Sequence, residues 1–454
     1  MLTTPTLLLA WRSLPSDTEP WLSTPIPSQP PEAGKFLLYA SHNGFGNQYK
    51  ALRKGLLLAY VLRRTLVLPP LLRHYDLECG EICCKPHVAA RLRNAAPLLY
   101  AKRNSDAAHE SLLRVFNLSS PLLTDVGVHV IDYPQYVRAS SPAGGDGQPG
   151  GGDWRAGGVH EVPLKCKDTA QWSSADFARE LGARSGRNER LLQLGSLYWF
   201  GVQRLLQDEP QLASLWRRLR VLPLAAPLRA VADRGASRLP EGGYASAHVR
   251  SLGWGDSSSL GEVIALWTAV EIDHARRANA TGTAALTSPS QLVPLFVATD
   301  LRAGTADPLL RPLVSSGRFA ARDLRSLELG GSAEWRALRS GEGGLSEGAA
   351  SMMADVAMCV HSRAFFSPSM RGAPTNQLLR RSSFSEYIQD AWELEHGATM
   401  RARAGSEHGI GNFLKSMAPW VETLELNVSA PLREALRQAG QVARGRRGDG
   451  RRNE

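Results

Sequence analysis

Two residues in the middle of the chain have the chemistry to hold a phosphate group. His248 and Arg250 end the segment Tyr244-Ala-Ser-Ala-His-Val-Arg250, which predicts a buried strand. Side chains two residues apart in a strand point to the same face. Arg250 is a permanent cation whose fork of N–H donors suits phosphate oxygens. An isolated His-x-Arg is more often a surface salt-bridge site, but this arginine enters the loop Ser251–Asp256, whose glycine, tryptophan and aspartate favour a ligand.

A second anion site is predicted in the turn His42-Asn-Gly-Phe-Gly-Asn-Gln48. The apolar run Phe36–Ala40 predicts a strand before it, and apolar residues at every fourth position from Leu52 to Tyr60 predict a helix after it. A strand, a glycine-rich turn and a helix aim backbone N–H groups at a phosphate, although such a turn can also bind nothing. It is not a dinucleotide fingerprint, because Tyr49 occupies the position of the third glycine, nor a Walker A loop, because Gly-Lys-Ser/Thr is missing.

The last quarter of the chain offers further polar groups. Ser382, Ser383 and Ser385 begin a predicted helix, where hydroxyls and backbone N–H groups form a further anion cradle or a plain N-cap. Asp355 lies in the apolar helical run Met352–Val360, and a buried carboxylate needs a partner. That partner could be the paired N–H donors of a guanine edge or, alternatively, an arginine of the same chain.

Alternating strands and helices must position these groups. Strands are predicted at 36–40, 65–68, 128–131, 244–250, 295–300 and 364–367, and a further apolar stretch at 190–200. Helices are predicted at 211–219, 225–235 and 260–277, through position 355 and from about 383, with a glycine-rich loop at 328–349. The alternation indicates an α/β fold of two Rossmann-like parallel-sheet domains facing a cleft. The expected divisions are a disordered segment 1–34, α/β domains 35–235 and 236–435, and a basic disordered tail 436–454.

Composition limits the possible partners. The chain has 454 residues, 43% of them hydrophobic and 21% charged, as expected of a globular protein with two domains. The net charge of +10 comes mostly from arginine, but the one dense basic cluster is the tail 444–452. No predicted helix has a basic face, so we do not predict nucleic-acid binding. The apolar run at the start is too short for a signal peptide or a membrane span, and no other segment is long enough to span.

The cysteines and glycosylation sequons favour the secretory pathway. The first half of the chain has four cysteines that could form two disulfides: Cys79, Cys83, Cys84 and Cys166. Three pairings are possible, and the pairing that joins the adjacent Cys83 and Cys84 is the least expected because it is strained. A zinc site that includes His74 and His87 is an alternative with unfamiliar spacing. Cys359 lies in an apolar run and is expected to be a buried thiol. Asn117, Asn279 and Asn427 each begin an Asn-x-Ser/Thr sequon.

No Asp-x-Asp sequence occurs in the chain. An enzyme that holds a nucleotide-sugar pyrophosphate through a metal ion would be expected to carry such paired acids. If phosphate is bound here, Arg250 and helix N-termini must neutralise it instead. We therefore expect no metal and no other cofactor.

In combination, these motifs resemble the GDP-fucose protein O-fucosyltransferase family. The turn His42–Gln48 resembles the Gly-x-Gly-Asn-Gln phosphate turn of that family, and Tyr244–Arg250 resembles its His-Leu-Arg strand. Phe296–Asp300 matches its Phe-Val-Ala-Thr-Asp strand, and Asp355–Phe366 followed by Ser382–Ser385 resembles its final segment. The segments occur in the family's order between Phe36 and about Asp390, although Met370–Arg380 looks inserted.

The resemblance implies a GT-B-like, inverting enzyme with no obligatory metal. It would move fucose from GDP-fucose to a Ser/Thr hydroxyl of a protein. A fucosyltransferase that acts on a glycan is the near alternative, and a non-catalytic nucleotide-binding scaffold is an alternative of another class. The C-terminal domain would bind most of the nucleotide sugar, inside the endoplasmic reticulum or Golgi lumen.

The resemblance also assigns roles. Gly44–Asn47 would contact the donor phosphates through backbone N–H groups, and Arg250 would stabilise the leaving GDP. Asp355 would read guanine, whereas Asn47 stands where some relatives carry a glutamate base. The donor-binding candidates are His42, Asn43, Gly44, Phe45, Gly46, Asn47, His248, Arg250, Asp256, Asp355, Ser382, Ser383 and Phe384. Arg250 and Asn47 are the catalytic candidates, and His42 and Asp256 are further candidates for a base.

Overall fold

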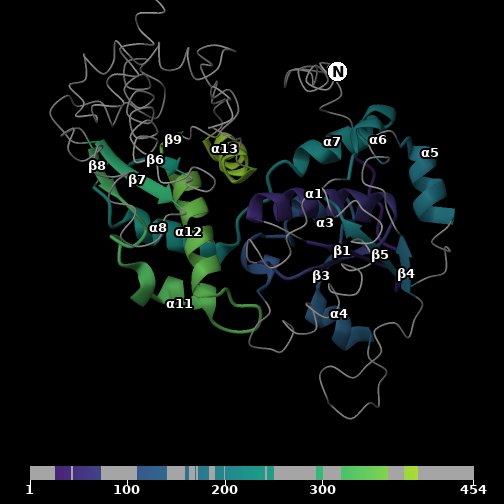
Figure 1. Ribbon diagram of the computed structural model, residues 1–454, viewed down its shortest axis with the longest axis horizontal. Coiled ribbons are helices and arrows are strands. Elements are labelled where there is room, and N and C mark those ends of the chain that lie inside the picture. The colour runs from purple at the N-terminus through teal and green to yellow at the C-terminus, as the bar shows by residue number, and fades with distance from the viewer. Residues whose placement is uncertain are drawn as a thin grey trace, which may run out of the picture. The chain divides into compact units, whose positions relative to one another are not determined.

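The chain forms two compact units, each with one parallel sheet (Figure 1). The computed structural model describes residues 26–41, 44–72, 110–140, 159–162, 169, 172–183, 190–198, 200–240, 243–249, 293–299, 319–366 and 383–396. The first unit comprises 1–44, 48–105 and 118–222, and the second comprises 45–47, 106–117 and 223–454. The predicted α/β fold with parallel sheets is confirmed, whereas the facing cleft and the domain limits stay predictions.

The sheet of the first unit has five parallel strands in the order β3-β2-β1-β5-β4. Its strands are β1 (Phe36–Ala40), β2 (Thr65–Leu68), β3 (Val130–Asp132), β4 (Val159–Val162) and β5 (Leu191–Ser196). The chain steps outward from β1 to β3 and then returns to the other side of β1. The strand order therefore reverses beside β1, where open α/β sheets bind their ligands.

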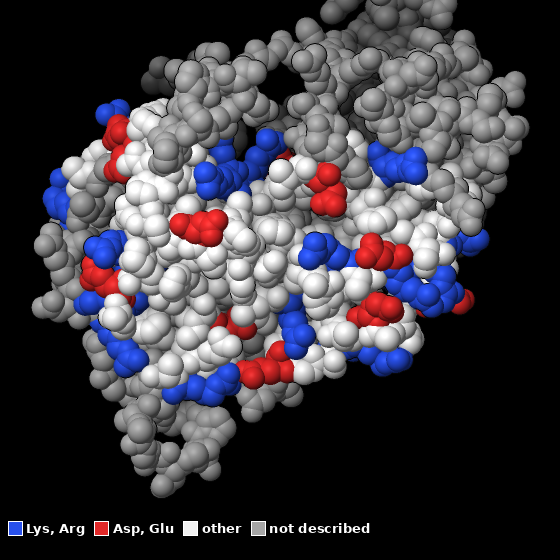
Figure 2. Space-filling model, turned by 180° about the vertical axis from the view of Figure 1, so that it is seen from behind, with Lys and Arg blue, Asp and Glu red and all other residues white. Residues whose placement is uncertain are grey.

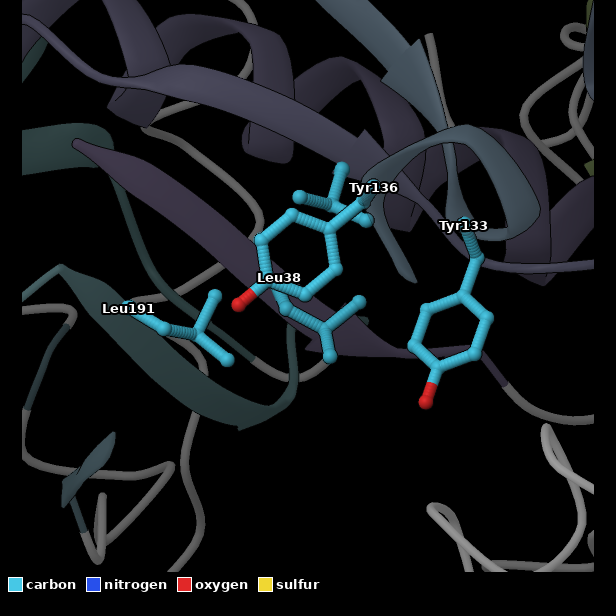
Figure 3. Close-up of a cluster of buried hydrophobic side chains, with 5 residues drawn as sticks. Leu38, Tyr133, Tyr136 and Leu191 are labelled. Atoms are coloured by element: carbon cyan, nitrogen blue, oxygen red, sulfur yellow. The ribbon is translucent and has the colours of Figure 1, made fainter. Parts of the chain in front are cut away.

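Helices cover both faces of this sheet. On one face, Tyr133 and Tyr136 of α4 (Tyr133–Ser140) pack on Leu38, Val67 and Leu191 (Figure 3). On the other face, α1 (Phe45–Val61) crosses β1 closely, because a Cβ atom on Gly55 would lie 3.1 Å from the ring of Tyr39. Burial on both faces explains why β1 is a continuous apolar run without alternation.

Helix α1 has the predicted buried stripe, and Leu52, Leu56 and Tyr60 are at most 2% exposed. Its Gln48 is also buried and holds Leu72 by two hydrogen bonds. The side-chain amide donates to the Leu72 carbonyl over 2.7 Å, and the Leu72 N–H donates back over 2.9 Å. The glutamine that ends the glycine turn therefore has a structural role.

The sheet of the second unit has four parallel strands in the order β8-β7-β6-β9 (Figure 1). They are β6 (Ala245–Val249), β7 (Val293–Thr299), β8 (Phe319–Arg322) and β9 (Ala364–Phe366). Helix α12 (Glu347–His361) packs on β6 and β7 and also contacts α8 (Ala226–Ala236), α11 (Ala333–Arg339) and α13 (Ser383–His396). The order reverses beside β6, so His248 lies near the end of the strand at the switch point.

Shorter elements complete the units. The first unit also contains α3 (Pro121–Thr124), α5 (Ser174–Phe177), the π-helix η5 (Ala178–Ala183), α6 (Gln203–Asp208) and α7 (Pro210–Arg218). The second also contains the 3-10 helices η3 (Leu112–Arg114) and η7 (Leu329–Gly331). Residues 110–117 belong to the second unit because Phe116 bridges to Leu224 and the N–H of Ala225 donates to the Val115 carbonyl over 2.9 Å.

Two predictions of secondary structure need correction. Strand β3 begins at Val130 rather than at position 128, because the Val128 N–H donates to the Leu123 carbonyl in the turn after α3. The predicted loop 328–349 contains helix α11, which Ser332 caps through its hydroxyl by accepting the Trp335 N–H over 3.0 Å. Trp335 and Leu338 are buried, and the packing of these two side chains stabilises the short helix although glycines lie on both sides of it.

Residues 26–34, which the sequence predicts to be disordered, are held on the first unit. The Gln29 N–H donates to Val126, the Glu32 N–H donates to Arg63, and the Tyr60 hydroxyl donates to Pro27. The remainder of the segment 1–34, the predicted helix 260–277 and the tail 436–454 lie outside the described residues. Within the described ranges, no helix is both long and apolar enough for a membrane span.

Candidate functional site

The first turns of α1 and α13 touch each other within the second unit. A Cβ atom on Gly46 would lie 2.5 Å from Cβ of Ser383 and 2.7 Å from the backbone nitrogen of Phe384. Real Cβ atoms do not approach this closely, so any side chain larger than that of glycine would push the two turns apart. The predicted phosphate turn and the predicted serine cradle are therefore neighbours.

Aromatic rings hold the two turns together. Phe45 is 3% exposed, and its ring centroid lies 5.9 Å from that of Phe384 and 5.7 Å from that of Tyr387, both edge-to-face. Phe116 stacks on Phe45 at 6.0 Å and meets Tyr387 at 5.9 Å. Such pairs each contribute about 0.5–1.5 kcal/mol beyond the area they bury. The Phe45 side chain is thus used in packing, and only the backbone of this residue could contact a bound nucleotide sugar.

His248 reaches the same turn of α13 from strand β6. Its ring lies 4.7 Å from the ring of Phe384, and its Nδ1 is 2.7 Å from the hydroxyl oxygen of Ser385. His248 is only 5% exposed, and Ser385 is fully buried. Three segments far apart in the sequence, at 45–46, 248 and 383–385, therefore form one contiguous cluster.

The electrostatics of the cluster favour an anion. Helix α1 has Gly44 as its N-cap, with no side-chain cap and no acidic residue in its first turn. Its first internal hydrogen bond runs from the Gln48 N–H to the Gly44 carbonyl over 3.2 Å. The N-terminus of a helix carries a partial positive charge, and here the N-termini of α1 and α13 meet. Glu386 lies in the first turn of α13, so the start of α1, which has no acidic residue, is the more favourable of the two for phosphate.

Asp355 projects from α12 and is partly buried. Burial raises the pKa of its carboxyl well above the usual value, and the nearby charge of Asp323, just after β8, raises this pKa further. In the described part of the chain, no arginine or other group pairs with the Asp355 carboxyl. The intramolecular arginine partner is thus not found there, and the carboxyl remains suited to external N–H donors.

Some of the other predicted residues lie within the described ranges and some lie outside them. Asn47 is partly buried in the first turn of α1. His42, Asn43, Arg250, Asp256 and Ser382 lie outside the described residues, as do Cys79, Cys83, Cys84 and Cys166. Cys359 is a buried free thiol, as predicted. Among the described residues, no group of three or more His, Cys, Asp or Glu could hold a metal ion, and the absence of a metal requirement stays a prediction.

The sequence did not reveal how Ser385, Phe116 and Tyr387 contribute. Ser385 was expected to cradle an anion or cap the helix, but it lies in the first turn and its hydroxyl meets His248 instead. Phe116 and Tyr387 carry no local motif. Their only sequence signal is that each is a large aromatic residue, Tyr387 within the helix predicted from about 383, and tertiary packing alone reveals the cluster.

Comparisons with known proteins point in the same direction as the motifs. No family profile matches the chain. A segment of 110 residues is 34% identical to O-fucosyltransferase 30 of Arabidopsis thaliana, and the match spans 23% of this chain and 20% of that relative. The resemblance to O-fucosyltransferases is therefore found by comparison as well as by motif.

Two solved structures are also similar over most of the chain. POFUT1 in complex with GDP-fucose is 12% identical, with 82% of this chain and 97% of that one covered at a TM-score of 0.41. The fucosyltransferase NodZ from Bradyrhizobium is 18% identical, with 78% and 92% covered at a TM-score of 0.33.

The close approach at Gly46 can be tested by Gly46→Ala. The added methyl group should separate the two turns, lower the stability by about 1–3 kcal/mol, and weaken any binding of GDP by at least about 10-fold. Thermal unfolding and calorimetric titration measure both effects. Gly348→Ala is the matched control, because a Cβ atom there would meet nothing within 4 Å. Equal behaviour of the two variants would contradict the steric argument.

The raised pKa of Asp355 gives a stability prediction with a defined sign. The folded protein binds this proton more tightly than the unfolded chain, so the contribution of Asp355 to stability falls as pH rises from its ordinary pKa through its raised one. Asp355→Asn should therefore raise the melting temperature, and by more at pH 8 than at pH 5. The GDP-induced stabilisation should be lost in the same variant. The exposed Asp125→Asn is the control, and a variant less stable than wild type at pH 8 would refute the prediction.

Proposed function

We propose that this protein is an inverting glycosyltransferase that moves fucose from GDP-fucose to a Ser/Thr hydroxyl of a protein. The observation that carries the proposal is the contact of one turn, at the start of α13, with both Gly46 and His248. The motifs that resemble the O-fucosyltransferases are far apart in the sequence, yet the fold brings three of them together. The plant relative, named an O-fucosyltransferase, supports the same reaction class.

The donor would be held at both of its ends. The backbone N–H groups at the start of α1 and α13 would bind the diphosphate, with His248 and Arg250 on the β-phosphate. Asp355 would accept the two N–H donors of the guanine edge, since its carboxyl has no partner among the described residues. No metal ion is needed in this arrangement, because cationic and dipolar groups neutralise the phosphates.

The reaction would be a single displacement. The acceptor oxygen attacks the anomeric carbon of fucose, the bond from that carbon to the β-phosphate oxygen breaks, and GDP leaves with the electron pair. Arg250 would stabilise the negative charge that develops on the leaving oxygen. The fucosyl group acquires oxocarbenium-like character, so the rate depends less on a strong base than on the leaving group. Asn47, His42 and Asp256 are the candidates to orient or receive the acceptor proton.

The donor assignment can be tested by ligand-induced stabilisation. GDP should raise the melting temperature by more than UDP, ADP or NAD at equal concentration, because only guanine offers paired donors to Asp355. A scaffold that has lost the site would respond to none of them. Mass spectrometry of acceptor candidates after incubation with GDP-fucose would then separate a protein acceptor from a glycan acceptor.

Arg250→Ala tests the catalytic assignment. Release of GDP from GDP-fucose should fall by about 100-fold or more, as when a preorganised charge-stabilising donor is removed elsewhere. Arg229→Ala removes the same charge from an exposed position of α8 and should leave turnover unchanged. Wild-type turnover in a folded Arg250→Ala variant would refute this role.

The proposal includes a lumenal location, which the sequon at Asn117 supports. Asn117 and Ser119 are both exposed in the turn between Phe116 and α3, so the acceptor amide is open to modification. Protein made through a eukaryotic secretory route should shift in mobility after N-glycosidase treatment, and Asn117→Gln should reduce that shift by one glycan. Ser119→Ala should match it. Identical shifts in wild type and both variants would show that Asn117 is not glycosylated.

A further inference from the structure

We infer that Ser385 is a positioning residue that holds the imidazole of His248 as a hydrogen-bond donor toward phosphate. This inference rests on the proposed donor-binding role of His248. Ser385 itself would not contact the donor, because its hydroxyl oxygen already lies 2.7 Å from Nδ1 of His248 and the residue is fully buried.

The environment fixes the ring on several sides. The backbone of His248 lies in the parallel ladder, where it pairs with Ala298 of β7. One face of the ring lies against Phe384, with the centroids 4.7 Å apart and the planes tilted by 39°. The Nδ1 edge meets Ser385. A ring restrained in this way keeps its other nitrogen, Nε2, in a constant direction.

The hydroxyl is also compatible with both protonation states of the ring that bind an anion. In neutral histidine one ring nitrogen is a donor and the other is an acceptor, whereas in the cation both are donors. When Ser385 donates to Nδ1, the neutral ring must carry its proton on Nε2. When the ring is charged, Nδ1–H donates to the Ser385 oxygen and Nε2 still carries a proton. A hydroxyl can take either role, so Ser385 supports both states in which Nε2 is a donor. In the other neutral tautomer, with the proton on Nδ1, Nε2 is an acceptor and does not suit phosphate.

The position of Ser385 in α13 connects the His248–Ser385 hydrogen bond to the predicted phosphate turn. Ser383 and Phe384, the two residues before it, form the surface against which Gly46 packs. The first turn of α13 thus sets both the approach of α1 and the orientation of His248. Ser385 thus resembles the hydrogen-bond partners of metal-bound histidines, which bond the ring nitrogen that faces away from the metal and so orient the ring.

The experiment is a double-mutant cycle on GDP affinity. Ser385→Ala should weaken GDP binding by about 3- to 10-fold, the range for loss of one hydrogen bond, while Ser385→Thr should stay within about 2-fold of wild type because it keeps the hydroxyl. In a His248→Ala background, Ser385→Ala should add no further loss. Ser246→Ala is the matched control, since this buried serine of β6 bonds Ser362 and the Cys359 carbonyl instead. Its affinity for GDP should be unchanged even if its stability falls.

Equal losses from Ser385→Ala with and without His248, or an unchanged affinity in a folded Ser385→Ala protein, would overturn the inference. Nitrogen NMR of histidine-labelled protein gives an independent readout, in which Nδ1 of His248 should shift in Ser385→Ala and not in Ser385→Thr. If the wild-type protein bound no GDP, the proposed function would fail, whereas the nitrogen shift would still show whether Ser385 holds the ring. An unshifted Nδ1 would overturn the inference whatever the affinity.

Discussion

The candidate site depends on one steric constraint, the absence of a side chain at Gly46. A methyl group there would lie 2.5 Å from Cβ of Ser383, which is closer than van der Waals contact, so the first turns of α1 and α13 meet only because this residue is glycine. The ring of Phe45 then packs on Phe384 and Tyr387 and fixes that approach. Since Phe384 and Ser385 also contact His248, the same constraint determines where the histidine ring lies. The backbone contact and the position of a polar side chain are therefore not independent.

Asp355 illustrates the cost that such a site places on the fold. A partly buried carboxyl with a raised pKa, beside a second carboxyl at Asp323, destabilises the folded state at neutral pH. An apolar residue at this point of α12 would pack without that penalty, since its helical neighbours Met353, Ala354 and Val356 are all buried. A ligand that supplies paired N–H donors would remove the penalty on binding. Loss of stability in the free protein and selectivity for the ligand would then have the same origin.

Many of the strands and helices could be predicted because local sequence patterns determine them. Strands β1, β2 and β6 and helices α1 and α12 follow apolar runs or apolar periodicity, and the glycine turn separates β1 from α1 as expected. The start of β3 was misplaced because Val128 is apolar and β-branched like a strand residue, yet its N–H serves the preceding turn. Helix α11 was missed because glycines surround it. The bond between His248 and Ser385 could not be predicted at all, since no local pattern encodes a pairing between segments so far apart.

A diphosphate could be held without a metal ion if helix N-termini and one cationic side chain together balance its negative charge. Each phosphate of GDP-fucose carries one negative charge, whereas a helix N-terminus contributes only about half a positive charge. The N-termini of α1 and α13 would therefore neutralise at most one phosphate, since Glu386 lies in the first turn of α13. A full cation is needed for the other, and Arg250 would supply it. Cleavage adds a further negative charge on the leaving oxygen, and the helix ends cannot supply more. An Nε2–H of His248 oriented toward that oxygen would supply the extra stabilisation, because a donor aimed where charge develops stabilises the transition state more than the ground state.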